Sequence, residues 1–147
     1  MSTLSSEEEV RTAVYQVFEA GKNKDFRLLA RVHADEPRFS KFDDHPPYGR
    51  QNAREAYMYE EVAFASLSDY EYNLRDLRID TFDWMAIATF ILDYRGMMVN
   101  NATFAGESIH GTSRVTMVFQ RKGKEWLIVH EHFSGIPESY SGRTQQP

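Results

Sequence analysis

The spacing of the apolar residues changes once along this 147-residue chain, and that change constrains the fold more than any other feature. Before Ser68 the apolar residues recur at helical spacing, as in Val10, Val14, Val17 and Phe18. After Ser68 they alternate or form continuous runs, as in β-strands. A chain whose helices all precede its strands is typical of an α+β fold, in which the helices pack against one antiparallel sheet.

Three helices are expected in the first part of the chain, because a capping residue stands before each of three apolar stretches. These residues are Ser5 or Ser6, Asp25 and Asn52. A glutamate follows the first and the last of them after three residues, as in a capping box. Gly21 is the expected C-terminal stop of the first helix.

About four longer strands are expected after Ser68. The alternation changes parity near Arg75 and Asp76, which predicts a β-bulge there. The other indications are an apolar run at 84–95, a turn at 100–101, a return strand at 103–111, and a hairpin that joins 113–121 to 125–133 through 122–124.

The last of these strands is apolar on both faces. Trp126 and Ile128 have one parity, and Leu127 and Val129 have the other. Three helices can cover only one face of such a sheet. A second copy of the chain is the simplest cover for the other face, so a homodimer through the sheet is expected.

Composition and charge exclude several classes of protein. The chain has 17 basic and 22 acidic residues, a net charge of −5, which argues against nucleic-acid and anionic-membrane partners. It has no cysteine and no apolar run near the roughly 18 residues that a membrane helix needs. We expect a cytoplasmic protein with one domain over residues 1–147, a core at about 6–137 and a polar tail at 138–147.

The segment 126–135 (WLIVHEHFSG) carries a family resemblance. It resembles the ending of proteins in the nuclear transport factor 2-like (NTF2-like) superfamily, and especially of its polyketide-cyclase-like bacterial branch. It also resembles the association domain of calcium/calmodulin-dependent protein kinase II, which ends in the same Val-His-x-His-x-Ser-Gly pattern. Further similar residues are Asp25-Phe26, the segment 39–42, Gly49 and Arg114-Val115-Thr116.

The resemblance implies a cone-shaped fold, in which a curved antiparallel sheet wraps around three helices and encloses an apolar cavity. It also implies homodimers that form through the sheet. The superfamily includes isomerases, dehydratases and polyketide cyclases, and also binding or assembly domains without catalysis. Membership therefore does not select a function, which has to be argued from the site.

Three residues are the candidate catalytic groups: Asp93, Tyr57 and His130. Asp93 interrupts an apolar strand, and burial would raise the pKa of its carboxyl group into the range that a general acid or base needs. The alternative is a structural ion pair between Asp93 and Arg114 on the adjacent strand. In the catalytic interpretation Asp93 or His130 is the base, and Tyr57 or Arg114 holds the developing oxyanion.

The candidate ligand-binding residues are Arg114, Tyr15, Phe39, Phe90 and His132. His132 and His130 are two residues apart on one strand, so they point to the same face. The alternative role for both is hydrogen bonding to a neighbouring strand, loop or dimer partner. No metal site and no cofactor are expected, because the other histidines, His33 among them, lie in segments that cannot be placed against this strand.

The sequence predicts a homodimer that binds a hydrophobic small molecule in an apolar cavity. If it is an enzyme, it catalyses a cofactor-independent acid–base reaction, namely isomerisation, dehydration or cyclisation of a hydrophobic carbonyl or polyketide-like substrate. The alternative is an assembly or ligand-sensing module without catalysis, similar to the kinase association domain.

Overall fold

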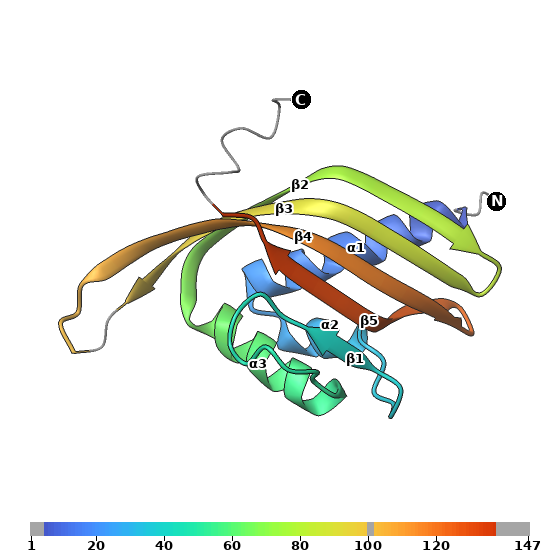
Figure 1. The fold of residues 1–147 in the computed structure, drawn as a ribbon, viewed down its shortest axis with the longest axis horizontal. Helices are drawn as coiled ribbons and strands as arrows, with labels where there is room; N and C mark the ends of the chain where they lie inside the picture. The colour runs from blue at the N-terminus through green and yellow to red at the C-terminus, as the bar shows by residue number, and fades with distance from the viewer. Residues whose placement is uncertain (1–4, 100–101, 138–147) are drawn as a thin grey trace.

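The chain forms three helices and a five-stranded curved sheet that is not closed (Figure 1). The computed structural model describes residues 5–99 and 102–137. In chain order the elements are α1 (Ser6–Asn23), α2 (Phe26–Arg31), β1 (Ser40–Phe42), α3 (Ala53–Ala65), β2 (Leu67–Phe82), β3 (Met85–Val99), β4 (Gly106–Lys122) and β5 (Glu125–Gly135). The predicted α+β class and the order of helices before long strands are confirmed.

The three helix starts are the predicted ones. The Ser5 side chain accepts a hydrogen bond from the backbone N–H of Glu8, and the Glu8 carboxylate accepts one from the backbone of Ser5. Asp25 caps α2, and Asn52 forms a second capping box at the start of α3. These caps satisfy amides that have no partner within the helix, and each contributes about 1 kcal/mol.

The predicted stop at Gly21 is wrong. Helix α1 continues to Asn23, and Lys24, in the left-handed conformation with φ 56°, is its C-cap. Gly21 is buried inside the helix under the ring of Phe64 in α3. A glycine lies here because a side chain would not fit between the two helices.

The sheet order is β1-β5-β4-β3-β2, and β2 to β5 form the predicted antiparallel meander. The short strand β1 pairs with β5 in parallel, so the sheet is mixed rather than antiparallel throughout. The predicted segments 103–111 and 113–121 belong to one continuous strand, β4, which begins only at Gly106. The expected turn at 100–101 and the tail at 138–147 lie outside the described residues.

The strands bend at bulges. The predicted bulge in β2 is confirmed, since the pairing with β3 shifts between Arg75 and Arg78, where Asp76 has φ 54°. A further shift lies between Ser68 and Glu71. Each bulge increases the local twist of the sheet, which lets the long strands curve around the helices.

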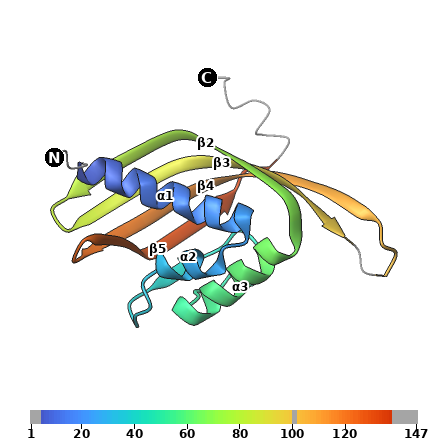
Figure 2. The ribbon, with the colours of Figure 1, turned by 180° about the vertical axis from the view of Figure 1, so that it is seen from behind.

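All three helices lie on one side of the sheet, as Figure 2 shows from behind. We call the side of the sheet that they cover the inner face, and the opposite side the outer face. The core lies between the helices and the inner face, and its largest fully buried apolar side chains are Phe18, Phe119, Leu29, Met117 and Ile128. None of the described helices is long and apolar enough to span a bilayer.

Candidate functional site: a buried ion cluster at the inner face

A third bulge, in β5, decides which side chains of that strand point inward. Ile128 pairs with Phe119, but the next residue along β4, Val118, pairs with His130, so β5 has one extra residue at Val129. Beyond this point Glu131 lies opposite the core residue Met117 and is fully buried. Without the extra residue the two histidines of β5 would point into the core instead.

Four charged side chains from four parts of the fold converge at this place. They are His33 after α2, Lys41 in β1, Glu60 in α3 and Glu131 in β5, and together they are called the ion cluster below. The Glu131 carboxylate forms an ion pair with Nε2 of His33. Oε1 of Glu60 lies 3.6 Å from the same nitrogen, and Oε2 of Glu60 lies 3.0 Å from Nζ of Lys41.

Local structure places each member of the cluster. The backbone of His33 forms a bridge with Ile128 of β5. Lys41 is the parallel partner of Glu131 in the sheet, so both side chains lie on the inner face. Glu60 stands one helical turn from Ala56 and one from Phe64 on α3, within the side of the helix that faces the core.

The position of its ring makes His33 a cation. Nδ1 lies 2.7 Å from the carbonyl oxygen of Leu29 and donates a hydrogen bond to it, while Nε2 faces the two carboxylates. Burial by itself would lower the pKa of His33, but the charges of Glu131 and Glu60 outweigh it and raise this pKa to about 9. At neutral pH the imidazole is therefore protonated.

Glu131 and Lys41 are also charged. Burial disfavours the ionised form of Glu131, yet the cations of His33 and Lys41 hold the pKa of its carboxyl group below the usual value. Burial likewise disfavours charged Lys41, but the carboxylates of Glu60 and Glu131 raise its pKa further above the ordinary range. The cations of His33 and Lys41 therefore lie against carboxylates in a site that is almost closed to water.

Gln51 adds a buried polar group beside the cluster. It pairs with Lys41 on the side opposite to Glu131, through backbone hydrogen bonds of 3.1 and 2.9 Å, so its side chain shares the inner face. Gln51 is 2% exposed, and neither its amide oxygen nor its amide nitrogen has a hydrogen-bond partner among the described residues. The side-chain exposure in the cluster rises from 0% at Glu131 to 13% at His33, so the cluster opens toward the solvent on the side of His33.

Two groups of described residues have the ligand types and spacing that a metal ion needs. One is His33, Glu60 and Glu131, and the other is Asp43, Asp44 and His45; in each the donor atoms lie within 4.8 Å of one another. In the first group the ammonium group of Lys41 already supplies positive charge to Glu60. In the second, Asp44 is held by Ser113 and His45.

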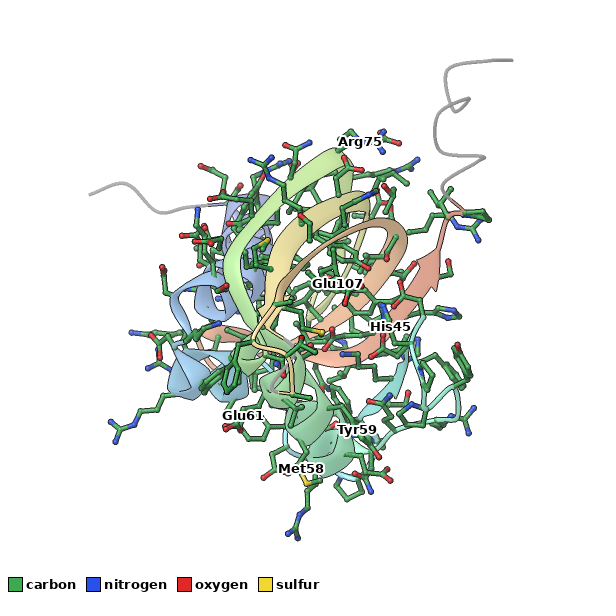
Figure 3. The ribbon with its side chains drawn as sticks, turned by 90° about the vertical axis from the view of Figure 1, so that its left-hand side faces the viewer. His45, Met58, Tyr59, Glu61, Arg75 and Glu107 are labelled. Atoms are coloured by element: carbon green, nitrogen blue, oxygen red, sulfur yellow. The ribbon has the colours of Figure 1, made fainter. Side chains whose placement is uncertain are left out.

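Asp93 lies on the outer face, where it forms an ion pair with Arg75 and not with the predicted partner Arg114. Nε and Nη2 of Arg75 donate to its carboxylate at 2.6 and 3.1 Å, and Oγ1 of Thr112 donates at 2.9 Å. Figure 3 shows Arg75 at the edge of the molecule farthest from α3. The hydrogen bonds from Arg75 lower the pKa of Asp93, opposite to the expected rise, and favour the ion-pair alternative.

His130, His132 and Arg114 also lie on the outer face. Nδ1 of His130 is 2.9 Å from Oγ of Ser40 in the neighbouring strand, which is the hydrogen bond that the structural alternative predicts. His132 is exposed and packs against the ring of Phe42. Nε of Arg114 donates to Ser134 at 3.2 Å. None of the three contacts the ion cluster, so their catalytic and ligand-binding roles stay predictions.

The predicted aromatic residues are divided between the core and the surface. Phe39 and Phe90 are buried in the core, and Phe39 packs against the ring of His33 with its centroid 6.1 Å away. Tyr15 is 38% exposed on α1. The hydroxyl group of Tyr57 donates a hydrogen bond to the carboxylate of Glu61, one turn along α3, and this hydrogen bond raises the pKa of Tyr57. Figure 3 shows its neighbours Met58 and Tyr59 on α3 at the end of the molecule opposite to Arg75.

The ion cluster was not predicted from the sequence, although two of its members have a recognisable signal. Glu60 interrupts the apolar stripe of α3, and Lys41 has the same parity as the buried Phe39. The sequence did not place His33 against the last strand, but the backbone of His33 pairs with that strand. The position of Glu131 depends on the bulge at Val129, and no residue type in this segment predicts that bulge.

Two hollows open elsewhere on the described surface. One, of about 240 Å³, lies between α1, α2 and the start of β5, and the other, of about 500 Å³, lies over β2, β3 and β4 beside Asp93. Neither is lined by a member of the ion cluster. The enclosed apolar cavity expected from the resemblance stays a prediction.

A curved sheet packed against three helices defines a class of small α+β proteins. The sequence profile of the SnoaL-like domain matches residues 10–139, and the chain belongs to this family, within the NTF2-like superfamily. The predicted family resemblance is thus confirmed. No protein of curated function matches the chain.

Solved structures share the fold at low sequence identity. A candidate dehydratase of the NTF2-like family from Streptomyces avermitilis has a TM-score of 0.75 at 19% identity, over 88% of this chain and 96% of that one. An NTF2-like protein from Salmonella enterica serovar Typhimurium has 0.76 at 19%, over 90% and 92%. The calcium/calmodulin-dependent kinase II hub of S. rosetta has 0.71 at 16%, over 92% and 100%.

Proposed function

We propose that this protein binds a small hydrophobic molecule with an oxygen function at the ion cluster and catalyses the loss of water from it. The observation that carries the proposal is the imidazolium group of His33, fixed between the Leu29 carbonyl and two carboxylates. A buried cation with a pKa of about 9 is a proton donor across the neutral range. The likeness to a candidate dehydratase supports the same class of reaction.

The two carboxylates differ in position, which suggests different roles. Glu131 is fully buried and paired with His33, so it orients the ring and stabilises its charge. Glu60 is 9% exposed and is the acid that a ligand reaches first, so it is the proposed base. Lys41, 3.0 Å from Glu60, stabilises negative charge that develops on a substrate carbonyl oxygen.

The proposed reaction is the dehydration of a β-hydroxy carbonyl compound. Glu60 removes the proton next to the carbonyl group, the C–O bond breaks, and His33 protonates the departing hydroxyl group so that it leaves as water. A conjugated double bond forms in the product. Because His33 and Glu60 lie 3.6 Å apart, the proton taken up by Glu60 can return to His33 for the next cycle.

The replacement His33→Gln tests this proposal. We expect it to lower kcat/KM for an aryl β-hydroxy ketone by about 10²- to 10⁴-fold, since it removes the proton donor and keeps a polar side chain. The conjugated product is followed by its ultraviolet absorbance. In the wild type kcat/KM should fall as the pH rises through about 9, because His33 loses its proton there. In Glu131→Gln this fall should move to lower pH.

A histidine outside the cluster provides the control. His110 is exposed in β4, so His110→Gln should keep the activity of the wild type. The proposal fails if His33→Gln and His110→Gln retain equal activity, or if the wild type converts no β-hydroxy ketone.

The outer face supports the second part of the proposal, a homodimer formed through the sheet. No described helix covers this face (Figure 2). Several apolar side chains on it are only half buried in the single chain, and Ile87 and Val118 are direct partners across β3 and β4. The likeness to a kinase hub favours self-association, and it also supports the alternative of an assembly module without catalysis.

Replacing Val118 by lysine tests the dimer. A charge placed at the centre of an apolar interface costs about 2 kcal/mol or more at each of two related positions, so the dimer should dissociate at concentrations at which the wild type is paired. Native mass spectrometry of the purified protein gives the oligomeric state and reveals any bound small molecule. Thr81→Lys, at an exposed position of β2, should leave the oligomeric state unchanged. A wild type that is monomeric contradicts this part of the proposal.

A further inference from the structure

We propose that the carboxamide of Gln51 determines ligand specificity at the ion cluster, and that it selects neutral ligands with a hydrogen-bond donor and an acceptor side by side. Amides and β-hydroxy ketones are ligands of this kind. The inference rests on the proposed location of the ligand site, but not on the proposed reaction. It concerns the residue that recognises the ligand, whereas His33 and Glu60 act on it.

The geometry of the sheet edge brings Gln51 to the site. Lys41 is paired on one side with Glu131 and on the other side with Gln51. Residues that are direct partners across strands project to the same face. The side chains of Glu131, Lys41 and Gln51 therefore form one row on the inner face, and Gln51 lies at the end of this row next to Lys41.

Burial without a partner indicates what the amide does. An amide offers two N–H donors and one carbonyl acceptor, and leaving them buried and unpaired costs about 1–3 kcal/mol. Gln51 is 2% exposed, and both ends of its amide lack a partner among the described residues. A methionine or leucine would fill the same space without this cost, so the carboxamide is explained by a group that binds to it.

The charge of the cluster selects a neutral ligand. The cations of His33 and Lys41 are already matched by the carboxylates of Glu60 and Glu131. Asp43, with Oδ2 3.7 Å from Nζ of Lys41, adds a further acid at the rim. A ligand carboxylate would have to approach these acids without a free cation to receive it, whereas a neutral amide or hydroxy ketone meets no such repulsion.

Four benzene derivatives of similar shape separate these properties: benzamide, acetophenone, N,N-dimethylbenzamide and benzoate. Benzamide carries a donor and an acceptor, acetophenone and the dimethylamide carry only an acceptor, and benzoate is an anion. We expect the wild type to bind benzamide at least about tenfold more tightly than each of the others, the equivalent of one hydrogen bond. Titrations followed by the side-chain amide NMR signals of the protein give the dissociation constants, and the signal of Gln51 should move.

The replacement Gln51→Met should abolish the preference for benzamide and leave the binding of acetophenone almost unchanged. Because it removes unpaired polar atoms, it should keep or increase the stability of the fold. Gln16→Met, on α1, is the matched control and should retain the preference. If Gln51→Met does not fold, Gln51→Glu serves as a second variant, in which an added negative charge should weaken the binding of every probe.

The inference is overturned if none of the probes shifts the Gln51 signal, if benzoate binds best, or if Gln51→Met keeps the preference of the wild type. An unmoved signal or an unchanged preference assigns Gln51 to packing or to a bound water, and tightest binding of benzoate contradicts the selection of neutral ligands. Failure of the proposed reaction is a different result. A protein that prefers benzamide but dehydrates no β-hydroxy ketone keeps the role of Gln51 and loses the chemistry of His33.

Discussion

Glu131→Leu is expected to lower the free energy of unfolding by about 3–5 kcal/mol at neutral pH. Glu131 is fully buried and is the partner of His33 in an ion pair, and it also faces Lys41 across the pairing of β1 with β5. Removing one charge from a buried group leaves its cations uncompensated, and the loss exceeds any gain from the added apolar surface. Urea denaturation followed by circular dichroism measures the change.

The effect of Glu131→Leu should depend on pH. The pKa of Glu131 is lowered in the folded protein, so its contribution is present above the unfolded value of 4.5 and is lost as the pH falls below it. The pKa of His33 is raised from 6.5 to about 9, so its contribution is complete below 6.5 and is lost as the pH rises to about 9. The wild type should therefore be most stable between about 4.5 and 6.5, and the variant should lose much of this dependence.

Glu107→Leu is the control, because Glu107 is exposed at the start of β4 (Figure 3). It should change the free energy of unfolding by less than about 0.5 kcal/mol. A loss below about 1 kcal/mol in Glu131→Leu would contradict the charged state of the ion cluster. It would indicate that Glu131 and His33 are both neutral and form an ordinary hydrogen bond.

Gly21→Ala is expected to destabilise the protein by about 1–3 kcal/mol, although the same change in an exposed helix stabilises it by about 1 kcal/mol. A methyl group at Gly21 would lie 2.4 Å from Cε1 and Cζ of Phe64, so the ring of Phe64 or helix α3 must move. Thermal and urea unfolding measure the loss. Phe64→Leu in the same chain should restore part of it, because the smaller side chain makes room for the methyl group.

Gly49→Ala is the matched control for this prediction. Nothing lies within 4 Å of a Cβ atom at Gly49, so the replacement should leave the stability unchanged or slightly raised. If Gly21→Ala is as stable as Gly49→Ala, the close contact of α1 with α3 is wrong. Since α3 carries Glu60, a shift of this helix should also disturb the ion cluster and move the pKa of His33 toward its ordinary value.

The sequence identified polar residues on the strands but not the face of the sheet on which each of them lies. Asp93 interrupts an apolar strand, and from the sequence its expected partner was Arg114, but its partner is Arg75 on β2 and both lie on the outer face. His130 and His132 do share a face, as their spacing predicts, yet that face is the outer one. The type and spacing of residues identified polar groups, but they did not identify the side of the sheet.

Features that depend on neighbours along the chain follow from the amino-acid sequence alone. The caps at Ser5, Asp25 and Asn52 start the three helices, and the change of parity near Arg75 marks the bulge in β2. These features involve residues within a few positions of each other, where hydrogen bonding and side-chain direction follow from the local sequence.

Which charged groups meet depends instead on contacts between distant parts of the chain. The extra residue at Val129 turns Glu131 inward, and the pairing of β1 with β5 then brings Lys41 beside it, while α3 adds Glu60 and the end of α2 adds His33. A shift of one residue in a strand reverses every side chain beyond it, and its free energy depends on packing between segments that are far apart in the chain. The chemistry of this site therefore depends on the register of a single strand.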